Sequence, residues 1–336
     1  MPWIGEAVNL ALSAVGAVVR NVGALSPRAG AAIALPLFAR VAAPRPVGLR
    51  EQPTMAQARR STVHIPGLAR TGVDVVVYEW GRGDTVVALA HGWNGRASQF
   101  AVLVRELVAE GHRVVAFDAP GHGETPGNGT YLIDWIEAFG ALQRRYGRLH
   151  AAIGHSFGGL ATLIAAADGV VIDRVVTVAA PADADTLLIQ FQAMLDYGDA
   201  TAAALRTRFA ERYFAGEADP FARLSPVRRP LPAGIPLLAV HDERDRLVPL
   251  GEVSRIASAN PGAHTLVTRS FGHNRVLEAD PVLDAVIDML AVAKPGARTL
   301  DQNSIAGASP LPTRSSRAKA PATARPREVV TTLAAR

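Results

Sequence analysis

The chain has 336 residues, of which 49% are hydrophobic, enough to bury a sizeable core; it has no cysteine, which excludes disulfide bonds and thiolate metal sites. Its net charge of +5 is uneven: residues 1–60 carry seven arginines against two glutamates, residues 295–336 have the same excess of five, and residues 61–294 therefore carry −5. A nucleic-acid-binding protein needs a basic face on a folded domain, and no nucleic-acid motif is visible, so we expect no nucleic-acid partner.

Residues 1–60 form a predicted helical N-terminal extension. The stretch 7–19 is mostly apolar but too short to span a bilayer. Two interpretations stay open: helices that dock on the main domain, or an arm on a membrane surface. In the second, the residues facing anionic lipid would be Arg20, Arg28, Arg40 and Arg45. The first residues lack the positive region of a signal peptide, so we expect a cytoplasmic protein, with or without a peripheral membrane contact.

From residue 61 onward, strand patterns alternate with helix patterns. Residues 61–65 and 73–80 alternate in polarity and predict an antiparallel hairpin. Further strands are predicted at 85–90, 113–117, 174–179, 236–241 and 264–270, and in the apolar run that begins at Leu149. Helices are predicted at 98–110, with Ser98 as N-cap, at 132–146 and at 280–292. This alternation predicts an α/β fold whose mainly parallel sheet has helices on both faces.

Two segments interrupt the pattern. Residues 182–232 follow the sixth strand, have no strand signal and contain helical stretches, so they predict a small helical lid over the strand ends. From Pro295 the chain is rich in proline, alanine, serine and arginine, and we expect a disordered basic tail at 295–336. Residues 61–294, with the lid included, form one predicted domain.

The sequence Gly154-His155-Ser156-Phe157-Gly158 joins a predicted strand to a predicted helix. A serine on such a sharp turn needs small neighbours, because the backbone is strained and passes close to other chain. The turn would raise the Ser156 hydroxyl above the sheet edge, where a nucleophile can act.

A serine hydroxyl also needs a base and a carboxylate that orients the base. His273 follows the last predicted strand and is the candidate base, whereas we expect His91, His122 and His155 to serve local packing and hydrogen bonds. Asp245 is the candidate carboxylate, because three residues past the strand end leave the loop room to turn back. The rival carboxylates are Asp242, Glu243 and Asp183.

Five motifs, in order, give the chain a resemblance to the α/β-hydrolase family, and in particular to bacterial members with a short helical lid. They are Ala90-His91-Gly92-Trp93, Phe117-Asp118-Ala119-Pro120-Gly121-His122-Gly123, the elbow around Ser156, Asp245-x-x-Val-Pro and Gly272-His273. The order Ser156, Asp245, His273 is that of the family's catalytic triad. The resemblance also implies an oxyanion hole formed by the backbone N–H groups of Trp93 and Phe157.

From these residues we expect a serine hydrolase without a cofactor or metal that cleaves a carboxylic ester through an acyl-enzyme on Ser156. The expected partner is a small-molecule ester or acyl substrate, held in an apolar pocket to which Trp93, Phe191 and Met194 contribute. Two alternatives stay open: an acyltransferase of the same fold, and a non-catalytic protein that keeps the fold and binds a ligand.

Overall fold

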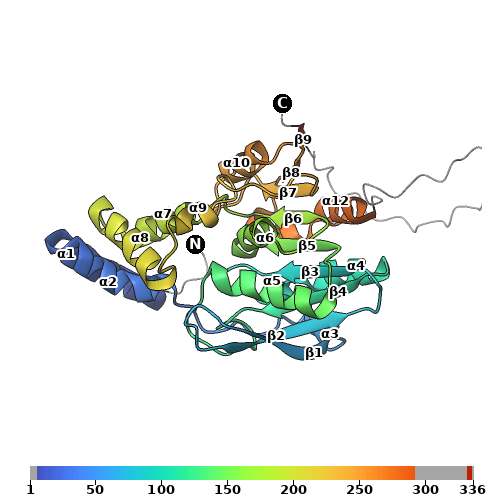
Figure 1. The fold of residues 1–336 in the computed structure, drawn as a ribbon, viewed down its shortest axis with the longest axis horizontal. Coiled ribbons are helices and arrows are strands. Elements are labelled where there is room, and N and C mark those ends of the chain that lie inside the picture. Colours follow the sequence, from blue (N-terminus) through green and yellow to red (C-terminus); the bar gives the residue numbers. More distant parts are fainter. Residues whose placement is uncertain (1–5, 292–330, 335–336) are drawn as a thin grey trace, which may run out of the picture.

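The computed structural model describes residues 6–291 and 331–334, and its framework is one sheet flanked by helices (Figure 1). Within these residues the sheet has nine strands in the order β1-β2-β4-β3-β5-β6-β7-β8-β9. The strands are β1 (Arg59–Ile65), β2 (Val73–Trp80), β3 (Val86–Ala90), β4 (Arg113–Asp118), β5 (Ala151–His155), β6 (Val175–Val178), β7 (Leu237–Asp242), β8 (His264–Thr268) and β9 (Thr331–Ala334). The pairs from β4 to β8 are parallel, and β1, β2 and β9 are added antiparallel. The predicted α/β fold with a mainly parallel sheet is confirmed.

Each face of the sheet has its own apolar core. Strands β3, β5, β6 and β7 are buried along their whole length, which explains their continuous apolar sequences. One core is covered by α4 (Ala101–Ala109) and α12 (Asp280–Ala291). The other is covered by α5 (Leu132–Tyr146), α6 (Phe157–Ala167) and α10 (Gly251–Ala259). Helices on both faces fix the strand ends, so that the loops at the carboxyl edge have a rigid base.

The start of α4 differs from the sequence prediction. A 3-10 turn, η1 (Ala97–Phe100), precedes the helix, and Ser98 does not cap it. The Ser98 hydroxyl instead donates a hydrogen bond of 2.6 Å to Glu51 Oε2. Glu51 directly precedes a short helix of the N-terminal extension, α3 (Gln52–Met55). A distant acceptor thus replaces the local cap, and no pattern within residues 98–110 could indicate it.

The helical cap predicted after the sixth strand is present. It consists of α7 (Ala184–Leu195), α8 (Asp199–Tyr213) and the short α9 (Pro220–Arg223), all between β6 and β7. The N-terminal helices α1 (Glu6–Leu25) and α2 (Pro27–Phe38) pack against α7 and α8 (Figure 1). A Cβ atom at Gly16 would lie 2.7 Å from the Leu195 carbonyl oxygen, and one at Gly23 would lie 2.4 Å from Thr201 Oγ1. Glycine therefore lets α1 and α2, which together form the N-terminal hairpin, pack directly on the cap.

The expected disordered tail, residues 295–336, falls mostly outside the described residues. Its described part, Thr331–Ala334, forms β9, which pairs antiparallel with β8 and so differs from the expectation. Four residues are too few to show a strand pattern on their own. Their order here comes from hydrogen bonds to the exposed edge of β8, which only the assembled sheet provides.

Candidate active site

Ser156 lies in the turn between β5 and α6, and its backbone is strained. Its φ angle is 54°, in the left-handed region that residues other than glycine rarely adopt. A Cβ atom at Gly158 would lie 2.2 Å from the Ala90 carbonyl oxygen, and one at Gly154 would lie 2.3 Å from the Gly158 carbonyl oxygen. The turn therefore requires the small neighbours that the sequence contains. It places a half-buried Ser156 at the carboxyl end of β5 and the N-terminus of α6.

His273, in the segment after β8, meets Asp245, in the loop after β7. Nδ1 of His273 lies 2.7 Å from Asp245 Oδ2, and the Asp245 side chain is fully buried. Asp245 Oδ1 accepts hydrogen bonds from the backbone N–H groups of Leu247 at 2.8 Å and Val248 at 3.0 Å. Burial opposes the charged carboxylate, but the hydrogen bond from His273 and these two amides hold the pKa of Asp245 below its ordinary value. The carboxylate can therefore orient the imidazole while ionised.

The three rival carboxylates make other contacts. Glu243 pairs with Arg269 at 3.1 Å, and Asp183 caps α7 and pairs with Arg255. Asp242 is buried and accepts hydrogen bonds from the backbone N–H groups of Arg244, Phe271 and Gly272 and from the Thr268 hydroxyl. Burial opposes its charged form, but these donors keep the pKa of Asp242 low. Asp242 thus shapes the loop that carries His273, whereas Asp245 contacts the imidazole itself.

His155 connects the turn of Ser156 to the loop of His273. Its Nε2–H donates to the His273 carbonyl oxygen at 2.8 Å, and its Nδ1 accepts a hydrogen bond of 3.0 Å from Gln99 Nε2. Burial lowers the pKa of His155 to about 3, so the ring is neutral and can make both bonds. The His155 and His273 rings are 4.8 Å apart, which places His273 beside the turn. No local signal in the sequence marked Gln99.

The contact expected between Ser156 and His273 is not made in this structure. Among the described residues, no hydrogen bond joins the Ser156 hydroxyl to Nε2 of His273. Such bonds are often long in unliganded hydrolytic sites and tighten when the substrate binds.

The loop that carries Trp93 is fixed by buried histidines. His91 Nδ1–H donates to the Gly92 carbonyl oxygen at 2.8 Å, and its Nε2 accepts from the Ala119 N–H at 3.0 Å. His122 Nε2 accepts from the backbone N–H of Asn94, the residue after Trp93, at 3.0 Å. A Cβ at Gly92 would lie 2.9 Å from Ser156 Cβ, so this loop lies directly against the serine. His91 and His122 therefore serve local hydrogen bonds, and the backbone of Trp93 is held beside Ser156.

A family model described as the alpha/beta hydrolase family matches residues 86–319, well over half of the chain. The chain belongs to the alpha/beta hydrolase family. The match begins at β3 and leaves the N-terminal hairpin and the strands β1 and β2 outside it.

Relatives of this alpha/beta hydrolase include a serine hydrolase-like protein of Dictyostelium discoideum, which is 29% identical over 115 residues. That match covers 32% of this chain and 32% of the relative, so it spans about a third of each protein. Among solved structures, an esterase from Pyrococcus furiosus is similar with a TM-score of 0.53 and 23% identity, over 75% of this chain and 97% of the esterase. Alpha/beta hydrolase domain-containing protein 10 from mouse is similar with a TM-score of 0.54 and 18% identity, over 70% of this chain and all of that one. At these identities the structures establish the fold alone.

In this alpha/beta hydrolase, a cluster of aromatic rings joins the Ser156 turn to the cap and to the N-terminal hairpin. The Phe157 ring lies 5.1 Å from Trp93 and 5.6 Å from Tyr131. Phe38 of α2 lies 5.2 Å from Tyr131 and 5.1 Å from Phe191 of α7. Trp93 and Phe191, both expected at the pocket, therefore belong to one cluster that contains the residue after Ser156.

Met194, the third residue expected at the pocket, is not one of these rings. It is 45% exposed and follows Gln190 by one helical turn, so the two side chains lie on the same flank of α7. Gln190 donates a hydrogen bond of 2.9 Å to the carbonyl oxygen of Leu247, two residues after Asp245. A part for Met194 in the pocket stays a prediction.

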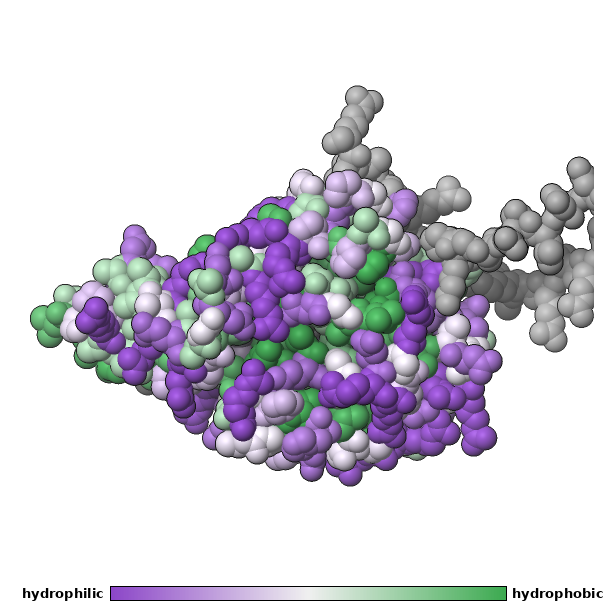
Figure 2. Space-filling model, in the orientation of Figure 1, coloured by the Kyte–Doolittle hydropathy of each residue, from purple (hydrophilic) through white to green (hydrophobic). Residues whose placement is uncertain are grey.

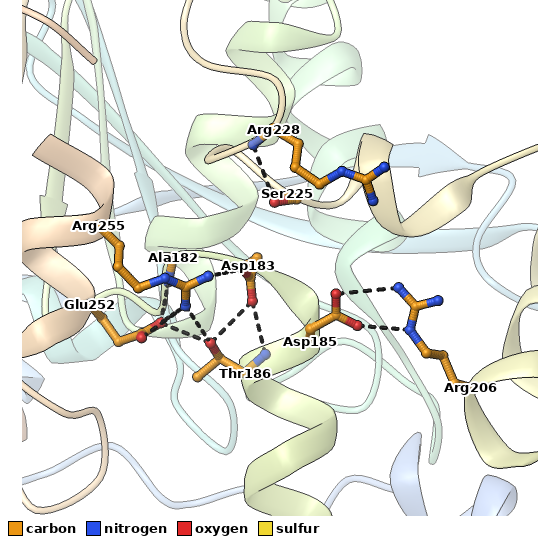
Figure 3. Close-up of polar contacts among 9 residues, drawn as sticks. All are labelled: Ala182, Asp183, Asp185, Thr186, Arg206, Ser225, Arg228, Glu252 and Arg255. Carbon is orange, nitrogen blue, oxygen red and sulfur yellow. Dashed lines mark hydrogen bonds and ion pairs between the residues drawn. The ribbon is translucent and has the colours of Figure 1, made fainter. Parts of the chain in front are cut away.

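The cap of the alpha/beta hydrolase is anchored to α10 by a polar network (Figure 3). Glu252 accepts hydrogen bonds from the Ala182 N–H at 2.8 Å and the Thr186 hydroxyl at 2.9 Å. The Arg255 guanidinium pairs with Glu252 and with Asp183, which is the N-cap of α7 (Figure 3). Both buried acids are thus neutralised by an arginine. Within residues 6–291 and 331–334, no three histidine or acidic side chains are grouped as metal ligands.

The three buried histidines around Ser156 predict that the hydrolase loses stability in mild acid. Burial lowers the pKa of His91 to about 4, and those of His122 and His155 to about 3, from an ordinary value of 6.5. In the unfolded chain they take up protons below pH 6.5, while in the folded chain they stay neutral. Their stabilising contribution is complete above pH 6.5 and is lost as the pH falls, by roughly 2 kcal/mol per histidine at about pH 5.

The measurement is the melting temperature between about pH 7.5 and about pH 5. His122→Gln, which removes one titrating ring, should reduce the pH dependence. A His122→Gln profile parallel to that of the wild type would contradict this explanation.

Proposed function

We propose that this alpha/beta hydrolase is a serine hydrolase that cleaves carboxylic esters through an acyl-enzyme on Ser156. The observation that carries the proposal is the His273–Asp245 pair, 2.7 Å apart, beside a strained turn that presents Ser156. The serine hydrolase-like description of the Dictyostelium relative supports a serine nucleophile. Catalysis then needs no group beyond those of the chain itself.

In the first half-reaction, Ser156 Oγ attacks the ester carbonyl carbon while His273 Nε2 takes the hydroxyl proton. Asp245 stabilises the resulting imidazolium through Nδ1–H. When the tetrahedral intermediate collapses, the carbon–oxygen bond to the alcohol breaks and His273 gives the proton to the leaving alcohol. In the second half-reaction, His273 takes a proton from water and the resulting hydroxide attacks the acyl carbon. The proton then returns to Ser156 Oγ as the carboxylic acid leaves.

Two backbone N–H groups would stabilise the negative oxygen of the intermediate. The amide of Phe157 is the first of α6, where no carbonyl of the helix can accept from it. The amide of Trp93 is in the loop that His91 and His122 hold against Ser156. Donors held in place before the reaction lower the barrier by about 3 to 4 kcal/mol each when measured by their removal.

The aromatic cluster supports an acyl group with an apolar chain. Trp93, Phe157, Tyr131 and Phe191 would surround a chain placed above the serine. The Tyr131 hydroxyl is buried and has no hydrogen-bond partner among the described residues. Because burying a hydroxyl without a partner is costly, a substrate oxygen in this region would gain a ready donor.

The test is covalent labelling of Ser156 with a fluorophosphonate, together with hydrolysis of p-nitrophenyl esters of increasing acyl length. The wild type should be labelled and should release p-nitrophenol, and Ser156→Ala should do neither. Absence of labelling with the fold intact would contradict a nucleophilic serine and favour the ligand-binding alternative. Labelling with slow hydrolysis that an added alcohol accelerates would favour acyl transfer.

If the cluster lines the acyl pocket, Phe191→Ala should move the preferred acyl chain to one or two methylenes longer. Each methylene that becomes buried is worth about 0.8 kcal/mol, so the ratio of kcat/KM values for the two chain lengths should change several-fold. The matched control is Ile189→Ala, an apolar side chain of the same helix that is 64% exposed. If Phe191→Ala keeps the wild-type chain-length profile and loses only thermal stability, the cluster packs the cap without lining the pocket.

A further inference from the structure

The outer side of the N-terminal hairpin, away from the cap, is apolar. A groove of about 300 Å³ runs between α1 and α2 and is lined by Ala14, Val15, Val18, Ile33 and Leu37. Val18 is 50% exposed, Ile33 36% and Leu25, at the tip of the hairpin, 91%. Hydrophobic residues, drawn in green, lie among hydrophilic ones at the left end of Figure 2, where Figure 1 places α1 and α2 beside α7 and α8. Among the described helices, none is long and apolar enough to cross a bilayer.

The charged residues of the segment 7–50 are all arginines. They number five, and the acids next to the segment are Glu6 at the start of α1 and Glu51 after it. Arg20 forms an ion pair with Asp196 of the cap, with 2.8 Å between Nη1 and Oδ2. Arg28, in the first turn of α2, and Arg40, just past its end, are exposed and have no ion pair within the described part of the chain. Two exposed arginines therefore stand at the two ends of α2.

We propose that the outer face of the α1–α2 hairpin docks on the surface of an anionic lipid bilayer. Val18, Ile33, Leu37 and Leu25 would enter the boundary between headgroups and acyl chains, and Arg28 and Arg40 would contact anionic headgroups. Stable attachment of a helix to a bilayer surface takes both an apolar and an electrostatic contribution, and this face has both.

Charge complementarity favours lipid over the other occupants. A second copy of the chain would bring an identical face with the same unpaired arginines, and like charges oppose such a contact. The segment 292–330 of this chain, which lies outside the described residues, carries an excess of five positive charges and would be repelled as well. A surface of phosphate groups above hydrocarbon complements both properties of the face.

The hairpin would not dock alone. Gly16 and Gly23 bring α1 to within van der Waals contact of Leu195 and Thr201, so α7 and α8 would be held at the bilayer with it. This inference concerns binding and does not depend on the proposed function. Ser156→Ala should bind vesicles as the wild type does.

The experiment is co-sedimentation of the full chain with vesicles of phosphatidylcholine alone and with one third phosphatidylglycerol. The wild type should bind the anionic vesicles, bind the neutral ones much more weakly, and dissociate as salt is added. Arg28→Gln and Arg40→Gln should each weaken binding about fivefold. Val18→Asp with Ile33→Asp should abolish it, and the single Val18→Asp serves if the double variant does not fold.

The matched controls are Val171→Asp, whose side chain is 36% exposed like that of Ile33, and Arg144→Gln on the exposed side of α5. Both should bind as the wild type. Equal binding of the wild type to neutral and anionic vesicles would overturn the proposal. So would a loss of vesicle binding in the control variants as large as that in the variants of the hairpin. A wild-type dimer in solution that Val18→Asp dissociates would assign the face to a second copy instead and would also overturn it.

Discussion

Asp245→Asn is expected to lower kcat for an ester substrate by about 10³- to 10⁴-fold while KM changes little. The amide can no longer stabilise the imidazolium that forms as His273 accepts the serine proton, and its NH₂ group favours the wrong tautomer of His273. The loss should occur in kcat because the Asp245–His273 bond of 2.7 Å acts on the transition state and not on substrate binding. The rate of fluorophosphonate labelling of Ser156 should fall in parallel.

The matched control is Asp242→Asn, which changes an equally buried carboxylate three residues earlier. Its oxygens accept hydrogen bonds from Gly272, Phe271 and Thr268, so the substitution should cost about 1 to 3 kcal/mol of unfolding free energy. We expect a much smaller loss of kcat once the variant is folded. The opposite pattern, with Asp242→Asn inactive and Asp245→Asn nearly unaffected, would show that the assignment of the carboxylate is wrong.

Gly158→Ala is expected to remove more than about 3 kcal/mol of unfolding free energy, at the upper end of overpacking effects. The added methyl would lie 2.2 Å from the Ala90 carbonyl oxygen and 2.4 Å from that of His91, and both are backbone atoms at the end of a buried strand that cannot rotate away. The displaced turn should also lose activity.

Gly251→Ala is the matched control, because a Cβ at Gly251 meets no atom within 4 Å at the start of α10. Its stability should stay within about 1 kcal/mol of the wild type. Urea unfolding of both variants, with kcat for the folded fraction, makes the comparison. A Gly158→Ala variant with wild-type stability and activity would mean that the close approach to Ala90 does not constrain the turn.

Features with a local or strongly periodic signal could be predicted from the sequence. The strands and helices around Ser156 lie where alternation and apolar runs placed them, because those patterns come directly from burial on one or both faces. The positions of Ser156, His273 and Asp245 followed from the order of the motifs along a parallel sheet, whose strand ends meet at one edge. Their catalytic roles remain a proposal.

Features that depend on a distant partner could not be predicted. Ser98 looks like a helix cap, but its hydroxyl goes to Glu51 of the extension. Gln99 holds His155, yet nothing near Gln99 in the sequence indicates this. In each case the deciding atom is far away in the chain.

The aromatic cluster also gives the chain an internal spectroscopic reporter. Trp93 is half-buried, and its ring is 5.1 Å from Phe157 and 5.8 Å from His122, whereas Trp80 and Trp135 are almost fully buried in the domain. If α7 moves away from the domain with the hairpin, Phe191 and Phe38 leave the cluster, and water gains access to the Trp93 indole. Its emission would then shift to longer wavelength, and the difference between the wild type and Trp93→Phe would separate this shift from the emission of Trp3, Trp80 and Trp135. Cap movement in this hydrolase can therefore be followed in real time by tryptophan fluorescence without an added dye.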